Sequence, residues 1–220
     1  SGRSTRHIEV SLPEGISYRE GDHIGVLPEN PPELIERVLE RFALNGDDYV
    51  QLNAESGTTS HLPSGMPVKI SELLANHVEM QEPATRAQIR AVAATTVCPP
   101  HVVELEALLE DSTYRDEVLT KRVTMLELVE AYMACEIPFG QFLSLLPALK
   151  PRYYSISSAP SHQEGKASLT VSVVRGAAWS GKGEYAGIAS NYLANRTSGD
   201  KIACFIHTPQ SNFQLPEQSE

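Results

Sequence analysis

The amino-acid sequence predicts a mostly β fold with an α insertion: a small antiparallel barrel whose strands come from both ends of the chain, with a helical subdomain between them. Near both ends, apolar and polar residues alternate as they do in half-buried strands, whereas between them apolar residues recur with the helical period. We therefore expect residues 1–70 and 150–220 to form the two parts of the barrel, and residues 71–149 the helical subdomain. A long insertion into a barrel loop costs little closure entropy.

The first part opens with strands and one helix. Residues 7–12 alternate polar and apolar, and the alternation resumes at 23–27 after a Gly-Asp turn. A helix follows over 30–42, where two prolines mark its start, and short strand-like runs return at 49–54 and 68–70. One stripe of the helix is apolar, so we expect it to face a core. The stripe consists of Leu34, Ile35, Val38, Leu39 and Phe42.

The middle region is predicted to contain several helices, because proline signals interrupt its helical pattern near Pro83, Pro99 and Pro138. After Pro151 the β pattern returns. We expect strands at 152–158, 169–174 and 201–206, and a short helix at 188–195.

Composition excludes several classes of function. A formal charge of −10 and a pI near 5.2 argue against a nucleic-acid partner, because phosphate backbones need a basic face. The three cysteines are odd in number and lack C-x-x-C spacing, so a reducing cytoplasm fits better than a disulfide framework or a zinc ribbon. No apolar run approaches the roughly 18 residues of a membrane helix, so no membrane is expected. No histidine pair has metal-ligand spacing, and we expect no metal site.

The strongest functional signal is the run 152–160, Arg-Tyr-Tyr-Ser-Ile-Ser-Ser-Ala-Pro. A strand that only filled a core would use Val and Ile. Arg offers a planar fork for a diphosphate, a Tyr ring a stacking surface, and a Ser hydroxyl a partner for a ring nitrogen. On a regular strand Arg152 and Tyr154 share one face, and Tyr153 and Ser155 the other, so we expect a local twist or bulge. Taken singly, each could be an ordinary surface or strand residue.

A phosphate site is indicated at Gly187, where a glycine precedes the short helix. Glycine lets the backbone approach a ligand closely, and a helix N-terminus presents free N–H groups and a partial positive charge. The alternative is an ordinary helix start after a glycine turn.

Three motifs stand out in the second half of the chain. They are Arg-Tyr-Tyr-Ser at 152–155, Leu-Thr-Val-Ser-Val-Val at 169–174 and Gly-Ile-Ala-Ser-Asn-Tyr-Leu at 187–193. In order and spacing they resemble the FAD-binding motifs of the diflavin reductases, the family of NADPH–cytochrome P-450 reductase. The resemblance covers essentially the whole chain, including Tyr-x-x-Gly-Asp-His at 18–23. Around 98–109 it is closest to the reductase part of bacterial self-sufficient fatty-acid hydroxylases, in which a haem monooxygenase is fused to its reductase.

The resemblance implies a ferredoxin-reductase-like FAD-binding barrel with a helical connecting subdomain, and it gives the site residues roles. Arg152 would hold the FAD diphosphate, Tyr154 would stack on the isoalloxazine, and Ser155 would be the catalytic residue near its N5 atom. Tyr153 would lie along the ribityl and ribose groups. Further contacts would come from Thr170, Val171 and Ser172 beside the flavin, Gly187, Ile188, Ala189 and Ser190 at the diphosphate, Arg122 as a second diphosphate contact, and Arg6 at NADPH.

One position departs from the family pattern. Where many relatives place an aromatic ring by the adenine, this chain has Gly176. Trp179 lies three residues further on and is a candidate substitute.

In such reductases hydride passes from NADPH to FAD, and electrons then go singly to FMN and to haem. The resemblance implies the FAD-binding domain of a reductase that serves a haem monooxygenase of the fatty-acid hydroxylase type. Its partners would be the FMN-binding domain and the monooxygenase domain of the same parent chain. The nicotinamide-nucleotide-binding α/β domain is expected to be absent, so the isolated piece would bind FAD yet transfer hydride poorly. The alternatives are a reductase for sulfite reductase haemoprotein or nitric-oxide synthase, and a non-catalytic docking module.

Overall fold

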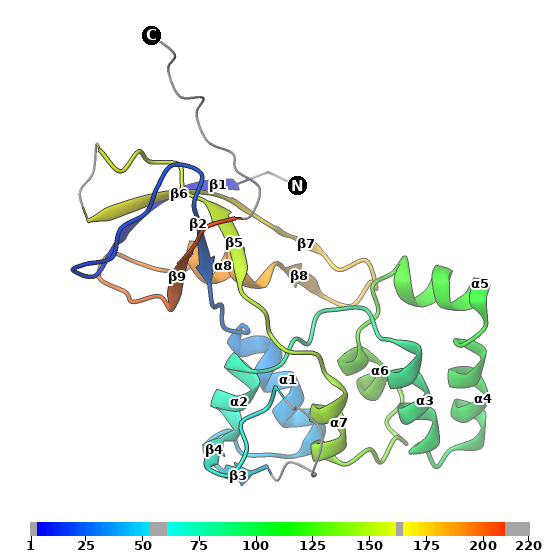
Figure 1. Ribbon diagram of the computed structural model, residues 1–220. Coiled ribbons are helices and arrows are strands. Elements are labelled where there is room, and N and C mark those ends of the chain that lie inside the picture. Colours follow the sequence, from blue (N-terminus) through cyan, green and yellow to red (C-terminus); the bar gives the residue numbers. More distant parts are fainter. Residues whose placement is uncertain (1–3, 53–60, 162–164, 210–220) are drawn as a thin grey trace. The chain divides into compact units, whose positions relative to one another are not determined.

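The computed structural model describes residues 4–52, 61–161 and 165–209. Within these ranges the chain forms two compact units, which we call the sheet unit and the helical unit (Figure 1).

The sheet unit comprises the described parts of residues 1–29, 150–176 and 186–220. Its first sheet pairs β1 with β6 antiparallel along their whole length, and its second has the order β5-β2-β9, also antiparallel (Figure 1). A single helix, α8, packs on β6. The elements are β1 (Ser4–Ser11), β2 (His23–Val26), β5 (Arg152–Ser155), β6 (Lys166–Val173), α8 (Ile188–Ala194) and β9 (Cys204–His207).

Alternation along these strands builds a small core, because every second side chain turns inward. Ile24 and Val26 of β2 are fully buried, as are Leu169 and Val171 of β6. The remaining core residues come from the turn before β2, from β6 and from α8. They are Tyr18, Ala167, Tyr192 and Leu193.

The predicted antiparallel strands at both ends of the chain are confirmed, but the described strands do not close into a barrel. Directly after β5, the chain is joined to β6 by the bridge between Ile156 and Leu169 and by bonds from the Ser157 N–H and hydroxyl to Ser168 O. Beyond that point the side-chain oxygen of Ser158 accepts from the Ser168 N–H, in the place of a backbone carbonyl. The polar run before Pro160 therefore ends the ladder, because a hydroxyl replaces a ladder bond and proline has no N–H to donate.

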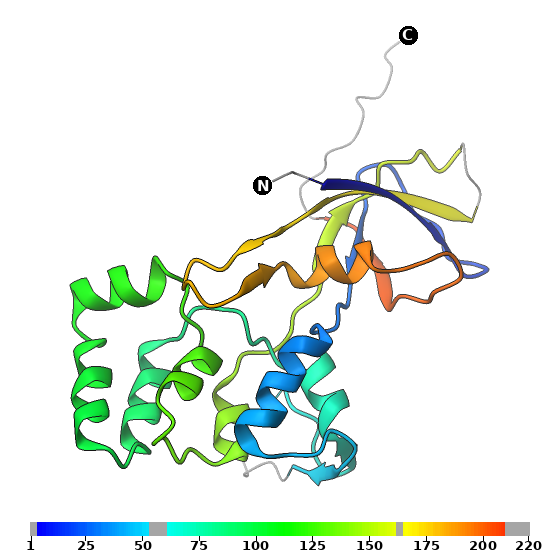
Figure 2. The ribbon, with the colours of Figure 1, turned by 180° about the vertical axis from the view of Figure 1, so that it is seen from behind.

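The helical unit comprises the described parts of residues 30–149 and residues 177–185. It begins earlier in the chain than the helical subdomain predicted at 71–149, because the first helix and a short hairpin pack with the later helices. In Figure 2, α3 and α4 lie side by side. The elements are α1 (Pro32–Phe42), β3 (Tyr49–Gln51), β4 (Pro67–Lys69), α2 (Ile70–Asn76), α3 (Arg86–Ala94), α4 (Pro99–Ala107), α5 (Asp111–Thr113), the π-helix η1 (Tyr114–Leu119), α6 (Met125–Ala131) and α7 (Phe139–Leu145).

Local sequence explains how these helices begin. Thr85 and Thr124 each cap a helix in a capping box, with Gln88 and Glu127 as the reciprocal partners. The apolar stripe predicted for the first helix does face the core. The helices then pack around fully buried side chains such as Phe142.

Polar side chains tie this unit together. The Arg37 guanidinium forms two bonds to the Glu130 carboxylate, at 2.9 and 2.7 Å, and this bonding raises the Arg37 pKa above its ordinary value. Arg41 donates to two backbone carbonyls near the end of α6, and the buried Asn30 amide donates to two carbonyls around the end of α2. These bonds join α1 and the segment before it to helices distant in sequence.

A two-stranded ribbon consists of β7 (Arg175–Ala177) and β8 (Glu184–Ala186). Its turn is closed by bonds between Ala178 and Gly183 and between Gly181 and Ala178. Within the ranges that the structure describes, no helix combines the length and apolar character that crossing a bilayer requires.

Candidate functional site

β5 carries the residues that the sequence singled out, and it is a regular strand. Arg152 and Tyr154 are half-buried, whereas Tyr153 and Ser155 are exposed, which confirms the predicted alternation. Of the predicted twist or bulge, the bulge is wrong: β5 pairs with β2 one residue to one, from Arg152 opposite Val26 to Ser155 opposite His23. The regular register follows from β2, whose alternate residues are packed in the core and leave no room for an extra residue.

The exposed face of the sheet β5-β2-β9 is an aromatic and imidazole surface. The Tyr153 ring lies 4.8 Å from the His207 ring and 6.0 Å from the Phe205 ring, between centroids. Phe205 lies directly over Gly25, where an added Cβ would come within 2.6 Å of the ring. Glycine on the central strand thus leaves the space that the Phe205 ring occupies. Tyr153 remains 52% exposed and leaves a phenol face open.

The opposite side of β5 is closer to the core. Tyr154 packs against the core of the sheet unit, and burial raises the pKa of its phenol, an effect that the Arg152 charge opposes. Arg152 donates from Nη1 to the carbonyl of Lys150 at 3.0 Å. The two residues that the resemblance assigns to diphosphate and ring stacking therefore share one side of the strand.

The turn before β2 fixes the end of β5. Tyr18 shares a hydrogen bond of 2.6 Å with the Ser158 hydroxyl, and the Asp22 carbonyl accepts from Ile156 N. Gly21 has φ +89°, a left-handed conformation that glycine adopts without strain. His23 Nε2 lies 3.1 Å from the Ser155 hydroxyl oxygen. Sequence reasoning noted this Tyr-x-x-Gly-Asp-His motif but gave it no structural role.

The predicted flavin-side residues of β6 lie opposite β1. Val171 is fully buried and pairs with Arg6, while Thr170 and Ser172 are exposed. The structure thus brings the predicted NADPH contact, Arg6, directly across from a predicted flavin contact.

A tightly bonded corner surrounds the start of α8. Gly187 N donates to Val174 O at 2.9 Å, and the Ser190 hydroxyl donates to Gly187 O while accepting from Val174 N. A Cβ on Gly187 would approach Ser190 Oγ to 3.0 Å and Val174 Cβ to 3.1 Å. The corner therefore needs its glycine for close packing, and it fixes the direction of the helix.

Arg122 and Trp179 belong to the helical unit, whereas the other predicted site residues belong to the sheet unit. Arg122 has φ +53°, which is unusual for a residue with a side chain, and its guanidinium lies 5.9 Å from the centroid of the Tyr185 ring. Trp179 is 73% exposed. Apart from its two chain neighbours, no described residue comes within 4 Å of the position that a Cβ on Gly176 would occupy.

Glu127 fastens the ribbon turn to α6. Its carboxylate accepts from its own helix cap at Thr124 N and from the Ser180 hydroxyl, while Lys182 Nζ reaches the Glu127 carbonyl at 3.4 Å. Glu127 is 5% exposed, so these bonds are largely shielded from water. Sequence reasoning did not identify this residue, although the Thr-x-x-Glu spacing of a capping box was a readable signal.

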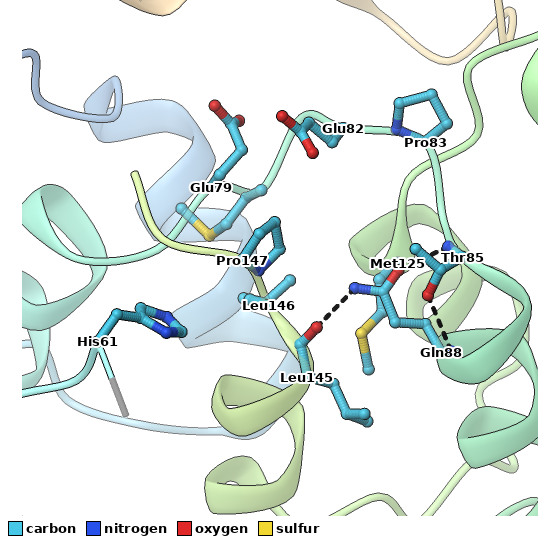
Figure 3. Close-up of a pocket in the computed structure, with 11 residues that line it drawn as sticks. His61, Glu79, Glu82, Pro83, Thr85, Gln88, Met125, Leu145, Leu146 and Pro147 are labelled. Atoms are coloured by element: carbon cyan, nitrogen blue, oxygen red, sulfur yellow. Dashed lines mark hydrogen bonds between the residues drawn. The ribbon is translucent and has the colours of Figure 1, made fainter. Parts of the chain in front are cut away.

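A cavity of about 350 Å³ lies within the helical unit (Figure 3). Met80, Met125 and Leu146 supply apolar lining, and the carboxyl groups of Glu79 and Glu82 stand near each other at one end. None of the residues predicted to hold a flavin lines it. Glu79 already accepts a hydrogen bond from Gln81 N, so the cavity does not offer an unsatisfied buried charge.

Comparison with known proteins identifies close relatives. The family described as "FAD binding domain" matches residues 1–192. The chain is 59% identical over its whole length to a bifunctional cytochrome P450/NADPH–P450 reductase of Bacillus cereus and 55% identical to one of Bacillus subtilis, and it covers 21% of each. A fusion protein of the same description from Fusarium oxysporum is 36% identical, with 20% covered. The chain thus spans about a fifth of the length of these relatives.

Proposed function

The chain belongs to the FAD binding domain family, and from this premise we propose that it is the FAD-binding domain of an NADPH-dependent diflavin reductase that passes electrons to a haem monooxygenase. The family match over 192 residues carries the proposal. The relatives described as P450 fusions favour a haem monooxygenase as acceptor over sulfite reductase haemoprotein or nitric-oxide synthase.

The chemistry of the sheet unit fits a flavin. A flavin has a flat ring with polar nitrogens and a diphosphate tail, so it needs an aromatic surface, hydroxyl donors and a cation. β5 supplies all three within four residues, with the Arg152 cation and the Tyr154 ring on one side and the Ser155 hydroxyl on the other. The outward hydroxyl of Ser155 is bonded to His23 and stays exposed at this face.

The proposed roles follow the resemblance. Arg152 holds the diphosphate by a charge-assisted contact, Tyr154 packs against the ring, and Ser155 lies at the ring nitrogen N5. Tyr153 lies along the ribityl chain. The remaining proposed contacts are Thr170, Val171 and Ser172 at the ring, Gly187, Ile188, Ala189 and Ser190 at the diphosphate, Arg122 as a second cation at the diphosphate, Trp179 at the adenine and Arg6 at NADPH.

FAD when bound supplies the chemistry: it accepts two electrons as a hydride and releases them singly. The protein binds and orients it. The same proposal includes NADPH as the electron donor and a cytoplasmic location. It also includes the FMN-binding domain and the haem monooxygenase domain as partners. Fatty-acid hydroxylation would be the activity of the whole fusion protein.

Flavin uptake tests the proposal. The purified chain, incubated with FAD and freed of excess, should be yellow and should release one equivalent of flavin on denaturation. A docking module without cofactor function would remain colourless. Failure to retain FAD at micromolar concentration would refute the proposed function.

Replacing Arg152 with Ala tests the assignment of the diphosphate contact. Loss of a charge-assisted bond should weaken FAD binding by about 1.5–3 kcal/mol, or roughly 10- to 150-fold in Kd. Fluorescence titration measures the change, and Arg90→Ala, an exposed residue on α3, is the matched control. Equal affinities of the two variants would exclude Arg152 as the contact.

A further inference from the structure

His23 and Ser155 are in contact, and the proposed roles of the site residues give this contact no function. They face each other across β2 and β5, and His23 Nε2 lies 3.1 Å from Ser155 Oγ. The second ring nitrogen, His23 Nδ1, is buried and has no hydrogen-bond partner among the described residues. The two ring nitrogens therefore stand in unlike surroundings, and this difference fixes the direction of the hydrogen bond.

The hydrogen must lie on Nε2. A proton on Nδ1 would be a buried N–H without an acceptor, and unpaired buried N–H groups are rarer in proteins than unpaired buried acceptors. The hydrogen bond that one nitrogen makes sets the tautomer of the ring. His23 is thus the donor and Ser155 Oγ the acceptor.

This direction decides what Ser155 can do. A serine hydroxyl has one hydrogen to donate and two lone pairs to accept with. Because His23 occupies a lone pair, the Ser155 hydrogen is left for a partner on the exposed face. With the opposite tautomer, Ser155 would donate to His23 and could offer an external group only a lone pair.

We propose that His23 is a positioning residue that sets the Ser155 hydroxyl as a hydrogen-bond donor toward the N5 atom of FAD. This inference rests on the proposed function. N5 of the oxidised ring carries a lone pair and no hydrogen, so it needs a donor. His23 acts through Ser155 and does not itself contact the flavin.

The surroundings hold the pair in register. Ile24, next to His23, is fully buried, and the Asp22 carbonyl on its other side accepts from Ile156 N. His207 pairs with His23 on the outer strand but packs against Tyr153. These contacts fix the backbone of His23 on the central strand, opposite Ser155.

A double-mutant cycle on the FAD-loaded chain tests the inference, with Ser155→Ala, His23→Ala and both together. The readouts are the midpoint potential of the flavin and the Raman frequency of the ring vibration that involves N5. Each single variant should shift both readouts in the same direction. In the Ser155→Ala background His23→Ala should add no further shift, because the effect passes through the hydroxyl. A purely structural histidine would give additive shifts, which would overturn the proposal.

Two further variants sharpen the cycle. His23→Gln keeps a side-chain N–H near the Nε2 position and should restore most of the wild-type potential. His7→Gln, an exposed histidine on β1, should leave it unchanged. Lack of rescue by His23→Gln would contradict the donor role.

A measurement without flavin separates this inference from the proposed function. Nitrogen NMR of the imidazole in the FAD-free chain reports which nitrogen carries the proton, and we expect Nε2. A proton on Nδ1 would overturn the inference even if the chain binds FAD. A chain with the expected tautomer that fails to bind FAD would instead refute the proposed function and leave the histidine as the donor to Ser155.

Discussion

The two units differ in how they use apolar and polar side chains. Among the described residues, twenty-two buried residues form the core of the helical unit, and eight form that of the sheet unit. The two units also differ in how far their polar side chains are buried. Asn30 and Glu127 of the helical unit are buried and bond to their own chain, whereas Ser155 and Tyr153 of the sheet unit stay exposed, although Ser155 shares a hydrogen bond with His23. The helical unit thus has the larger core and buried, bonded polar groups, whereas the sheet unit leaves polar and aromatic side chains at its surface.

A large-to-small change in the helical core should have the largest effect on stability. Phe142 is fully buried, with its ring centroid 4.9 Å from that of Phe42, so Phe142→Ala should lower the free energy of unfolding by about 3–5 kcal/mol. Urea unfolding measures the loss. Val103→Ala, at a position 67% exposed, is the control and should change little.

The same variant probes whether the units are separable. If the sheet unit carries the cofactor site, FAD affinity measured in the absence of denaturant should change far less than stability. A loss of FAD affinity as large as the loss of stability would show that FAD binding depends on the core of the helical unit.

Periodicity predicted the elements of both units because burial follows it. The alternation at 169–174 and the stripe from Leu34 to Phe42 each mark the side that faces a core, and the structure confirms both. The family and its cofactor were predictable for another reason. Three motifs in fixed order over the whole chain form a pattern too specific for packing alone, and the family match over residues 1–192 confirms it.

Contacts between residues distant in sequence could not be predicted. His23 and Ser155 are 132 positions apart, and only the strand register brings them together. The barrel was wrongly predicted for a related reason. The ladder ends at Ser158 because the Ser158 hydroxyl, and not a backbone carbonyl, accepts the hydrogen bond from Ser168 N–H. The individual roles of Arg152, Tyr154 and Ser155 at a flavin stay predictions.

Removing Glu127 tests whether the closed polar contacts of the helical unit contribute to its stability. Glu127→Ala removes the reciprocal bond of the α6 cap and leaves the Ser180 hydroxyl without its acceptor, so we expect a loss of about 1–3 kcal/mol. Faster hydrogen exchange at residues 177–185 should accompany it. Glu36→Ala, exposed on α1, is the control. Unchanged exchange in the ribbon turn would show that Glu127 serves only its own helix.

The smallest expected effect is the response of the sheet unit to alkali. Burial raises the pKa of Tyr154, Tyr192 and Cys204, all in the sheet unit, whereas Tyr132 is the tyrosine of the helical unit with a pKa raised by burial. A raised pKa means that the unfolded chain loses its proton first. The stability that the tyrosines contribute is therefore complete below the ordinary tyrosine pKa of 10.0, and it is lost as the pH rises through the folded value. For Cys204 the contribution is complete only below the ordinary thiol pKa of 9.0.

Tyr154→Phe removes one of these titrations, so the stability of the FAD-free chain should fall less steeply with pH above the ordinary tyrosine value than in the wild type. Urea unfolding at a series of alkaline pH values measures the slope. Tyr49→Phe, at a position 63% exposed, is the control and should leave the slope unchanged. Equal slopes for the two variants would show that Tyr154 is open to water rather than closed by the small core. The two units would then differ only in the number of residues in their cores.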